Sequence, residues 1–513
     1  MLRFLLLLMF LSATAFSQSP KVYKAPKFES TWHLPSKHPD RIVLNLGQNS
    51  ENSASVTWRT AFENKVGFAE IAKATAAPKF WRTAKRIKAT KYELDGTDVP
   101  KAGIKSNYFS VNFTDLDPNT LYGYRVGNGE YWSEWIQFKT ASDKPEKFSF
   151  LYVGDAQNFI LELWSRLIRQ SYKMAPNASF IIHAGDLVNH AHNEKEWTEW
   201  FEAGGWIHRT LPSISVPGNH EYRPIEEGSK NRELSIQWNP QFTLPENGPE
   251  GLKETVYYTD YQGVRIIALN TNRDIDKQLP WLENVLANNP NKWTVVTYHH
   301  PLYSASEGRN NVELRTKLKP LFDKYKVDLS LQGHDHSYAR GRVSPLEENI
   351  VDGINRRDIT GTVYVVSVSG GKMYNLNEGW EDFGAKRERG AENTQLFQLI
   401  TVNGDKLSYE SYTATGELYD AFDLIKNNEG VNLFVERKNN AIAGRRHKNT
   451  INYYDELPLD LKDKILTKYE GFKISRTEVL EKEGKLFYTI EITNGNKRVY
   501  LLANDKGEVV EDD

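Results

Sequence analysis

Apolar and polar residues alternate over residues 40–141, which predicts short β-strands joined by turns and no helical period. In Ser53–Thr60 the alternation puts Val56 and Trp58 on one face of a strand, and Tyr108–Phe113 forms another strand. This region contains no cluster of catalytic or metal-binding residue types. The pattern therefore indicates an all-β structural or interaction domain.

From residue 142 to residue 428 the pattern changes to strand, loop and helix. Phe148–Val153 is an apolar strand, and Phe159–Met174 repeats its apolar residues at helical spacing. Further apolar runs that stop at polar clusters are Ser179–His183, Trp293–Thr297 and Val327–Leu331. Strands that alternate with helices and carry polar residues at their carboxyl ends indicate an α/β domain.

The carboxyl-terminal part divides into a polar connector and a small α+β unit. The connector, residues 429–450, is basic and is interpreted as a solvated linker rather than a nucleic-acid-binding patch. Residues 451–513 contain a predicted helix, Leu457–Tyr469, and predicted strands at Phe487–Ile492 and Arg498–Leu502. This pattern resembles the PepSY-like domains of exported bacterial proteins, without a diagnostic motif. Nothing in the sequence identifies a partner for this unit.

The amino terminus has the pattern of a secretory signal peptide. Arg3 precedes the apolar run Phe4–Phe10, and the small residues of Ser12–Ser17 follow it. The apolar run is too short to span a bilayer. We therefore expect residues 1–17 to be a signal peptide. The mature protein is expected to be secreted, periplasmic or extracellular, with no stable membrane anchor.

Composition and charge restrict the chemistry. The 513 residues are enough for about three domains. They carry 65 Lys and Arg against 67 Asp and Glu, a net charge of −2, which argues against a stable nucleic-acid partner. The cysteine count is 0, which excludes disulfides, zinc–thiolate sites and cysteine nucleophiles. Any metal must therefore be held by His, Asp, Asn or Gln.

Five polar clusters carry the candidate chemistry. In chain order they are Gly154–Gln157, Gly185–Asn189, Gly218–Glu221, Tyr298–Pro301 and Gly333–His336. Each cluster alone has an ordinary explanation as a turn or a surface feature. Together they supply carboxylate, amide and imidazole groups, the ligands that suit divalent first-row metals. We therefore expect two neighbouring metal ions that share one carboxylate, the arrangement used for phosphoester hydrolysis.

The Leu-x-Pro-x-Thr-x-Tyr pattern of Leu116–Tyr122 resembles the tyrosine corner of fibronectin type III domains. Together with the five motifs, it resembles the calcineurin-like metallophosphoesterases, and specifically the purple acid phosphatases, which have a fibronectin type III-like amino-terminal domain. The resemblance covers residues 40–428. It implies a multi-domain protein with a β-sandwich over residues 40–141 and an α/β four-layer αββα sandwich over residues 142–428.

The resemblance also implies roles for individual residues. The expected ligands of the first metal are Asp155, Asp186 and His336, and those of the second are Asp186, Asn219, His299 and His334. His220 is expected to stabilise the phosphate or to protonate the leaving oxygen. His300 and Arg309 are candidate substrate contacts, with plain packing and a surface salt bridge as the respective alternatives.

Two positions depart from the family pattern. Purple acid phosphatases have a tyrosine ligand of ferric iron three residues after the bridging Asp186, where this chain has Asn189. The superfamily often has Asp-x-His at the first motif, where this chain has Gln157. Either amide is a further candidate metal ligand, or water fills the position. Gln157 can equally be a hydrogen-bonding neighbour of the ligands.

The expected function is hydrolysis of phosphate monoesters by attack of a metal-bound hydroxide, with Asp186 and His220 as catalytic residues. The expected cofactors are two divalent ions of Zn, Mn or Fe, and the expected partner is a small phosphorylated substrate. A phosphodiesterase or nucleotide pyrophosphatase would use the same ligands and differ in the pocket walls, around Tyr222–Thr259 and Ser304–Asn310. A non-catalytic surface-binding protein with a relict metal site is the alternative outside enzymes.

Overall fold

The structure is a computed structural model that describes residues 33–343, 359–437 and 459–512, apart from 483–484, 495–496 and 505–507. The expected signal peptide, residues 1–17, lies outside the described residues, as does the connector from residue 438 onward. Among the residues that the structure describes, no helix is long and apolar enough to cross a membrane.

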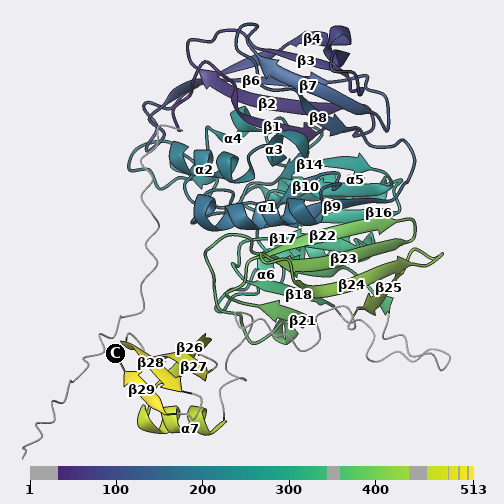
Figure 1. Cartoon of the computed structure of the whole chain (residues 1–513). Coiled ribbons are helices and arrows are strands. Elements are labelled where there is room, and N and C mark those ends of the chain that lie inside the picture. Colours follow the sequence, from purple (N-terminus) through teal and green to yellow (C-terminus); the bar gives the residue numbers. More distant parts are fainter. Residues whose placement is uncertain are drawn as a thin grey trace, which may run out of the picture. The chain divides into compact units, whose positions relative to one another are not determined.

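Two antiparallel sheets form the amino-terminal β-sandwich (Figure 1). One contains β1 (Asp40–Leu46), β2 (Ala54–Ala61), β5 (Thr90–Asp95) and β6 (Lys105–Phe113), and the other contains β3 (Phe68–Lys73), β4 (Lys85–Lys88), β7 (Leu121–Gly127) and β8 (Ile136–Lys139). Val56 and Trp58 of β2 are buried together in the core of this sandwich, as the alternation predicted. The hydroxyl of Tyr122 accepts a hydrogen bond from the backbone N–H of Asp117 at 2.8 Å, which is the expected tyrosine corner.

The sandwich shares a sheet with the central domain. β1 pairs in parallel with β11 (Ser213–Ser215) through Asn45 and Ser213. This pairing produces a 12-stranded sheet in the order β19-β25-β24-β23-β22-β9-β10-β11-β1-β2-β6-β5. The amino-terminal domain is therefore continuous with the central domain at the level of backbone hydrogen bonds.

Two sheets pack face to face in the central domain. Besides β11, the first sheet contributes β9 (Phe148–Val153), β10 (Ile181–His183), β19 (Ile359–Thr360), β22 (Leu396–Asn403), β23 (Lys406–Thr413), β24 (Leu418–Lys426) and β25 (Asn432–Glu436). The second sheet consists of β14 (Tyr257–Tyr261), β15 (Val264–Ala268), β16 (Trp293–Tyr298), β17 (Leu329–Gln332), β18 (Tyr338–Arg342), β20 (Val363–Val366) and β21 (Lys386–Ala391). Successive residues of β15 point to opposite faces of the second sheet. Ile266 packs in the core that this sheet shares with the first sheet, and Ile267 packs in the core on the outer face of the second sheet.

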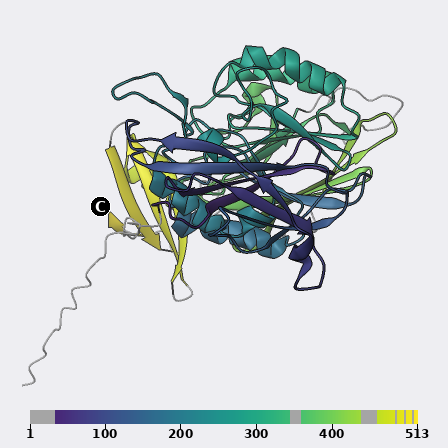
Figure 2. The same ribbon diagram turned by 90° about the horizontal axis from the view of Figure 1, so that it is seen from above.

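Helices cover the outer faces of both sheets. A π-helical turn, Ile160–Trp164, leads into α1 (Ser165–Met174), which packs with α2 (Glu194–Gly204) against the first sheet. Helices α5 (Ile275–Ala287) and α6 (Val312–Lys324) pack against the second sheet. Figure 2 shows the two helix layers on opposite sides of the strands. The layers follow the helix–sheet–sheet–helix order that the resemblance implied.

Short elements complete the connections of the described residues. They are the helices α3 (Ile207–Thr210) and α4 (Trp238–Gln241), the 3₁₀ turns Phe80–Thr83 and Glu381–Phe383, and the hairpin of β12 (Tyr222–Arg223) and β13 (Glu233–Leu234). The β12–β13 hairpin begins directly after the third polar cluster.

The central sheet extends further along the chain than the sequence predicted. Residues 429–450 were assigned to a linker, but Asn432–Glu436 forms β25, which pairs with β24. Asn432 and Phe434 of this short strand are buried. The first part of the predicted linker is therefore an ordered strand of the first sheet.

The carboxyl-terminal unit consists of one helix and a four-stranded antiparallel sheet. Its elements are α7 (Leu459–Lys468), β26 (Lys473–Lys482), β27 (Lys485–Asn494), β28 (Lys497–Asn504) and β29 (Val509–Asp512). Leu461 and Ile465 of the helix pack on Ile490 and Ile492 of the sheet in a separate hydrophobic core. The α+β composition is as predicted, and the PepSY-like assignment stays a prediction.

Candidate metal centre

The five polar clusters follow strands whose carboxyl ends meet at one edge of the two sheets. β9, β10 and β11 are parallel neighbours in the first sheet, and β16 and β17 are parallel neighbours in the second. Each of these strands ends inside one cluster or is separated from it by at most two residues. In open α/β sheets, ligands bind outside the carboxyl ends of the strands. The topology thus brings together residues that lie up to about 180 positions apart in the chain.

Four of the predicted ligands have a left-handed backbone conformation. Their φ angles are 46° at Asp155, 51° at Asp186, 76° at His334 and 40° at His336. For residues other than glycine this conformation costs about 1–3 kcal/mol, and such residues concentrate at functional sites. The chain therefore tolerates strain where the turn has to aim a side chain at the edge of the sheet.

Two glycines let the ligand loops approach each other closely. A Cβ atom on Gly218 would lie 2.2 Å from Oδ1 of Asp186, and a Cβ atom on Gly333 would lie 2.5 Å from Oδ2 of Asp155. Both distances are far below van der Waals contact. Any larger residue at Gly218 or Gly333 would displace a predicted ligand.

The structure groups the first three predicted ligands as expected. Ligand atoms of Asp155, Asp186 and His336, all buried, lie within 4.8 Å of one another. The Gln157 amide lies in the same group, because its Nε2 is 2.9 Å from Oδ2 of Asp186 and 2.9 Å from Nε2 of His336. Gln157 therefore lies among the predicted ligands of the first metal, in contact with two of them.

A second group lies on the other side of Asp186. Ligand atoms of His299, His300 and His334 lie within 4.8 Å of one another. Nε2 of His299 is 3.2 Å from Oδ2 of Asp186 and 3.2 Å from Oδ1 of Asn219. Asp186 thus contacts both groups, which is the position required of a bridging carboxylate. His300, a candidate substrate contact from the sequence, is itself a member of this second group.

Backbone carbonyl groups fix the orientation of two predicted ligands. Nδ1 of His299 donates to the carbonyl of Ala184 at 2.9 Å, and Nδ1 of His336 donates to the carbonyl of Lys372 at 2.9 Å. With the proton on Nδ1, the neutral imidazole carries on Nε2 the lone pair that a metal ion needs. Such outer contacts set the tautomer and ring orientation of metal-binding histidines.

The electrostatics of the centre are those of a cation site. Burial raises the pKa of Asp155 well above its ordinary value, and burial lowers the pKa of His336 to about 3. Burial opposes ionisation of Asp186 and of His299, but their mutual attraction lowers the pKa of Asp186 and raises that of His299 to about 9. Oδ1 of Asp155 and Oε1 of Gln157 are buried with no hydrogen-bond partner. The oxygen and imidazole donors, including these two unpartnered oxygens, fit a divalent cation.

His220 lies at the rim of this cluster and faces it. Its backbone N–H donates to Oδ1 of Asp186 at 2.8 Å, and its Nε2 is 3.9 Å from Oδ2 of the same carboxylate. Its Nδ1 is 2.7 Å from the carbonyl oxygen of Asn189. The side-chain amide nitrogen of Asn189 is 2.9 Å from Nδ1 of His190. In this structure Asn189 therefore contacts His220 through its backbone and points its amide nitrogen at His190.

The two other candidate substrate contacts have defined protein partners. Nδ1 of His300 is 3.0 Å from the hydroxyl oxygen of Thr271. Arg309 donates to the carbonyl oxygen of His334 at 3.0 Å and to Oδ1 of the buried Asp335 at 2.9 Å. The salt-bridge alternative thus describes Arg309 in this structure, and Arg309 braces the His334 loop.

Three charged residues at the site were given no role from the sequence. The buried carboxylate of Glu221 accepts hydrogen bonds from the backbone N–H groups of Asp186, Leu187 and Gly218 at 2.9, 2.9 and 2.7 Å. Arg223 contacts His220, and Lys372 follows the glycines after Ser369. Glu221 belongs to the Gly218–Glu221 cluster, so its position at the site could have been predicted from the sequence. Nothing in the sequence near Arg223 or Lys372 marks them.

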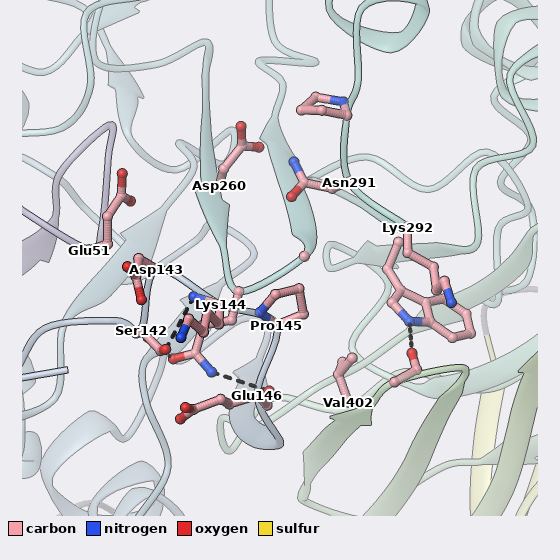
Figure 3. Close-up of a pocket in the computed structure, with 15 residues that line it drawn as sticks. Glu51, Ser142, Asp143, Lys144, Pro145, Glu146, Asp260, Asn291, Lys292 and Val402 are labelled. Carbon is pink, nitrogen blue, oxygen red and sulfur yellow. Dashed lines mark hydrogen bonds between the residues drawn. The ribbon is translucent and has the colours of Figure 1, made fainter. Parts of the chain in front are cut away.

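Two cavities differ in their relation to the site. One, of about 510 Å³, is lined by His300 together with the loops before α5 and α6. The other, of about 470 Å³, lies at the turns before β15 and β16, the strand ends opposite to the ligand loops. Figure 3 shows Glu51, Asp143 and Asp260 around this second cavity, and Asp260 is paired with Arg265 at 2.7 Å. Only the first of these two cavities adjoins the ligand cluster.

Two stretches of the chain match the models of known families. Residues 148–338 match the model of the calcineurin-like phosphoesterase family, and residues 39–140 match the purple acid phosphatase N-terminal domain. A phosphoenolpyruvate phosphatase of Allium cepa is 26% identical over 380 residues, covering 68% of this chain and 74% of that protein. The Fe(3+)-Zn(2+) purple acid phosphatase 12 of Arabidopsis thaliana is 27% identical over 289 residues, covering 51% of this chain and 59% of that protein.

A solved structure supports the same fold. The purple acid phosphatase PPD1 from yellow lupin (Lupinus luteus) seeds superposes with a TM-score of 0.62 at 19% identity. The superposition covers 77% of this chain and 75% of the lupin chain. The amino-terminal β-rich domain and the central metallophosphoesterase fold are thus shared with a purple acid phosphatase.

Proposed function

We propose that this chain, in which residues 148–338 form a calcineurin-like phosphoesterase domain behind a purple acid phosphatase N-terminal domain, is an exported phosphate monoester hydrolase with two divalent metal ions. The observation that carries the proposal is the place of Asp186. Its Oδ2 is 2.9 Å from Gln157 in the first ligand group and 3.2 Å from His299 in the second. One carboxylate between two sets of donors is what a dinuclear site requires.

The ligand sets follow from this geometry. Asp155, Asp186 and His336 would hold the first ion, and Asp186, Asn219, His299 and His334 would hold the second. When bound, two divalent cations would lower the pKa of a coordinated water and neutralise charge on the phosphoryl oxygens. Gln157 would complete the first position, since a half-turn of its amide exchanges Nε2 for the unpartnered Oε1.

His220 is assigned the role of acting on the substrate. Its Nδ1 is held at the carbonyl oxygen of Asn189, so its Nε2 is directed toward Asp186 and the ligand cluster. A side chain in this position can bind a phosphoryl oxygen or donate a proton to the leaving oxygen. His300 would line the approach from the adjoining cavity.

Asn189 determines the kind of metal pair that is proposed. A neutral amide stabilises a trivalent ion less than an anionic phenolate does, so a pair of divalent cations is favoured. Less total charge on the metals makes a coordinated water a weaker acid. The protein should therefore lack a purple colour and work best at neutral or alkaline pH. An active purple protein with tightly held ferric iron would contradict this assignment.

The deciding experiment combines metal analysis with a pair of substrates. The purified protein should hold two divalent ions per chain and hydrolyse p-nitrophenyl phosphate faster than bis(p-nitrophenyl) phosphate. A preference for the diester would favour the phosphodiesterase or nucleotide pyrophosphatase alternative, whose ligands are the same. A folded protein with no bound metal and no phosphoesterase activity would favour the relict-site alternative. Amino-terminal sequencing of the exported protein tests the signal peptide of residues 1–17.

A further inference from the structure

Two cationic side chains near the predicted ligand cluster, one of them in contact with His220, have no carboxylate within ion-pair distance among the described residues. Arg223, on β12, and Lys372, in the loop after β20, are both partly buried. Over the described ranges 33–343 and 359–437, neither forms an ion pair within 4.0 Å. Arg309, on the same side of the molecule, is by contrast paired with Asp335 at 2.9 Å. Arg223 and Lys372 therefore keep their charge available to a ligand.

Arg223 is held against the face of the site by neutral groups. Its Nη2 donates to the carbonyl oxygen of Asn189 and lies 2.9 Å from Nδ1 of His220, which contacts the same carbonyl. Its Nε is buried and has no hydrogen-bond partner. Burial and the neighbouring Arg232 lower the pKa of Arg223, and the carboxylates of Glu221, Asp186 and Glu196 offset this only in part. A partly buried cation in this state gains most from an anion that arrives from outside.

Lys372 approaches the cluster from the side of the first metal position. Its carbonyl oxygen accepts the hydrogen bond from Nδ1 of His336, so its backbone is fixed at the ligand. Its ammonium lies 5.2 Å from the ring centre of Tyr374, and that ring is 4.8 Å from the ring of His336. Arg223 and Lys372 thus lie at the ligand cluster on different elements, Arg223 against His220 and Lys372 against His336.

We propose that Arg223 and Lys372 bind the non-bridging oxygens of the substrate phosphoryl group and thereby select dianionic monoesters over monoanionic diesters. The proposal rests on the proposed function. A phosphate monoester carries about −1.5 to −2 charge at pH 7, because its second pKa is about 6, whereas a diester carries one charge. Two unpaired cations at the rim of the site favour the species with the greater charge. Arg223 lies in the Tyr222–Thr259 insertion, where the sequence placed the choice between the two substrate classes.

The rival role for Arg223 is positioning of His220. If Arg223 only oriented the imidazole, its loss would slow monoesters and diesters alike, and phosphate affinity would fall no further than it does in His220→Ala. If Arg223 binds the phosphoryl group, its loss weakens phosphate binding and acts on the monoester. The ratio of the two kcat/KM values and the affinity for inorganic phosphate separate these roles.

The experiment uses Arg223→Gln and Lys372→Met in the full metal-loaded chain. Each variant should lower kcat/KM for p-nitrophenyl phosphate by about 10- to 100-fold, the usual cost of a lost charged hydrogen bond. The loss should appear chiefly in KM, with the bis(p-nitrophenyl) phosphate value changed by less than about 3-fold. The dissociation constant of inorganic phosphate, measured by calorimetry, should rise in parallel with KM. Lys253→Gln is the matched control, because it removes one exposed charge that is paired only with Glu246.

Failure of this proposal can be told apart from failure of the proposed function. Equal losses on monoester and diester, or an unchanged phosphate affinity in variants that hold two metals, would overturn the assignment and leave the phosphoesterase intact. If the metal-loaded wild-type chain bound phosphate but hydrolysed neither ester, the proposed function would fail. The phosphate affinities of the two variants would then still decide whether these cations bind the anion.

Discussion

Where the amino-terminal sandwich meets α2, buried arginines face the carboxylates of Glu194 and Asp40, whereas at the ligand loops buried carboxylates face imidazoles and amides. At the first place, Arg41 and Arg59 donate to the same Oε2 of Glu194 at 2.5 and 3.0 Å. Arg59 also makes a two-point contact with Asp40 at 2.8 and 2.7 Å. We refer to Asp40, Arg41, Arg59 and Glu194 as the interface ion cluster.

The metal centre lacks the counter-charges that complete the interface ion cluster. Asp155 receives one backbone hydrogen bond at Oδ2 from His334, and its Oδ1 has no partner. The cost of burying unpaired carboxylates is high, and it persists in a native fold where something else supplies the positive charge. Both regions bury several charged or ionisable groups. The difference is that the interface ion cluster pairs its charges within the chain, whereas the Asp155 carboxylate at the metal centre keeps one oxygen without a hydrogen-bond partner.

The largest expected effect comes from changing the residue that joins both ligand groups. Asp186→Asn keeps the shape of the side chain and removes the charge that holds two cations together. Activity on p-nitrophenyl phosphate should fall by about 10³-fold or more, because several kcal/mol of transition-state stabilisation depend on the metals. Metal analysis of the variant should show fewer than two ions per chain. Near-normal turnover with both ions bound would refute the bridging role.

The next effect concerns the side chain that faces the substrate. His220→Ala should retain both metals, since the contact of residue 220 with Oδ1 of Asp186 is made by the backbone N–H. The rate should fall by about 10²- to 10⁴-fold if His220 transfers a proton. The loss should shrink for esters with good leaving groups, which need no proton. A loss of the same size for all leaving groups would instead indicate phosphate binding by His220.

The interface ion cluster should affect stability and not the chemistry. Glu194→Gln leaves two buried arginines with one carboxylate fewer, which should cost about 3–5 kcal/mol of unfolding free energy. Metal content and kcat of the folded variant should stay near wild type, because the Glu194 side chain contacts none of the predicted ligands. Urea unfolding measures the loss. Glu246→Gln, which breaks an exposed pair with Lys253, is the control and should cost less than about 1 kcal/mol.

The comparison of these two regions also explains which parts of the structure could be predicted from the sequence. The ligand loops were predictable, because each polar cluster directly follows an apolar run, and parallel strands deliver their ends to one edge. The contact between Arg41 and Glu194 was not, because it joins residues 153 positions apart through side chains of ordinary surface type. β25 was missed because its buried positions include Asn432, a residue typical of loops. Lys372 was missed because its place depends on the path of the glycine loop after β20.

The partly buried carboxyl group of Glu199 gives the smallest expected effect, a change in stability that depends on pH. Glu199 of α2 is partly buried near Glu162 and Glu196, and burial together with these like charges raises its pKa to about 7. The folded state therefore keeps the proton of Glu199 up to about pH 7, whereas the unfolded chain releases it near its ordinary pKa of about 4.3. Between these values the folded state binds more protons, so the stability contributed by this group falls as the pH rises.

Glu199→Gln should leave unfolding free energy nearly unchanged at pH 4 and raise it at pH 8 by about 1 kcal/mol, since solvent screens a partly exposed carboxylate. Glu202→Gln, at an exposed position of the same helix, serves as the control in urea unfolding at both pH values. An equal gain at pH 4 and pH 8 would mean that the variant acts through helix propensity and not through the charge of Glu199, whereas a loss at pH 8 would mean that a counter-charge stabilises Glu199 as in the interface ion cluster.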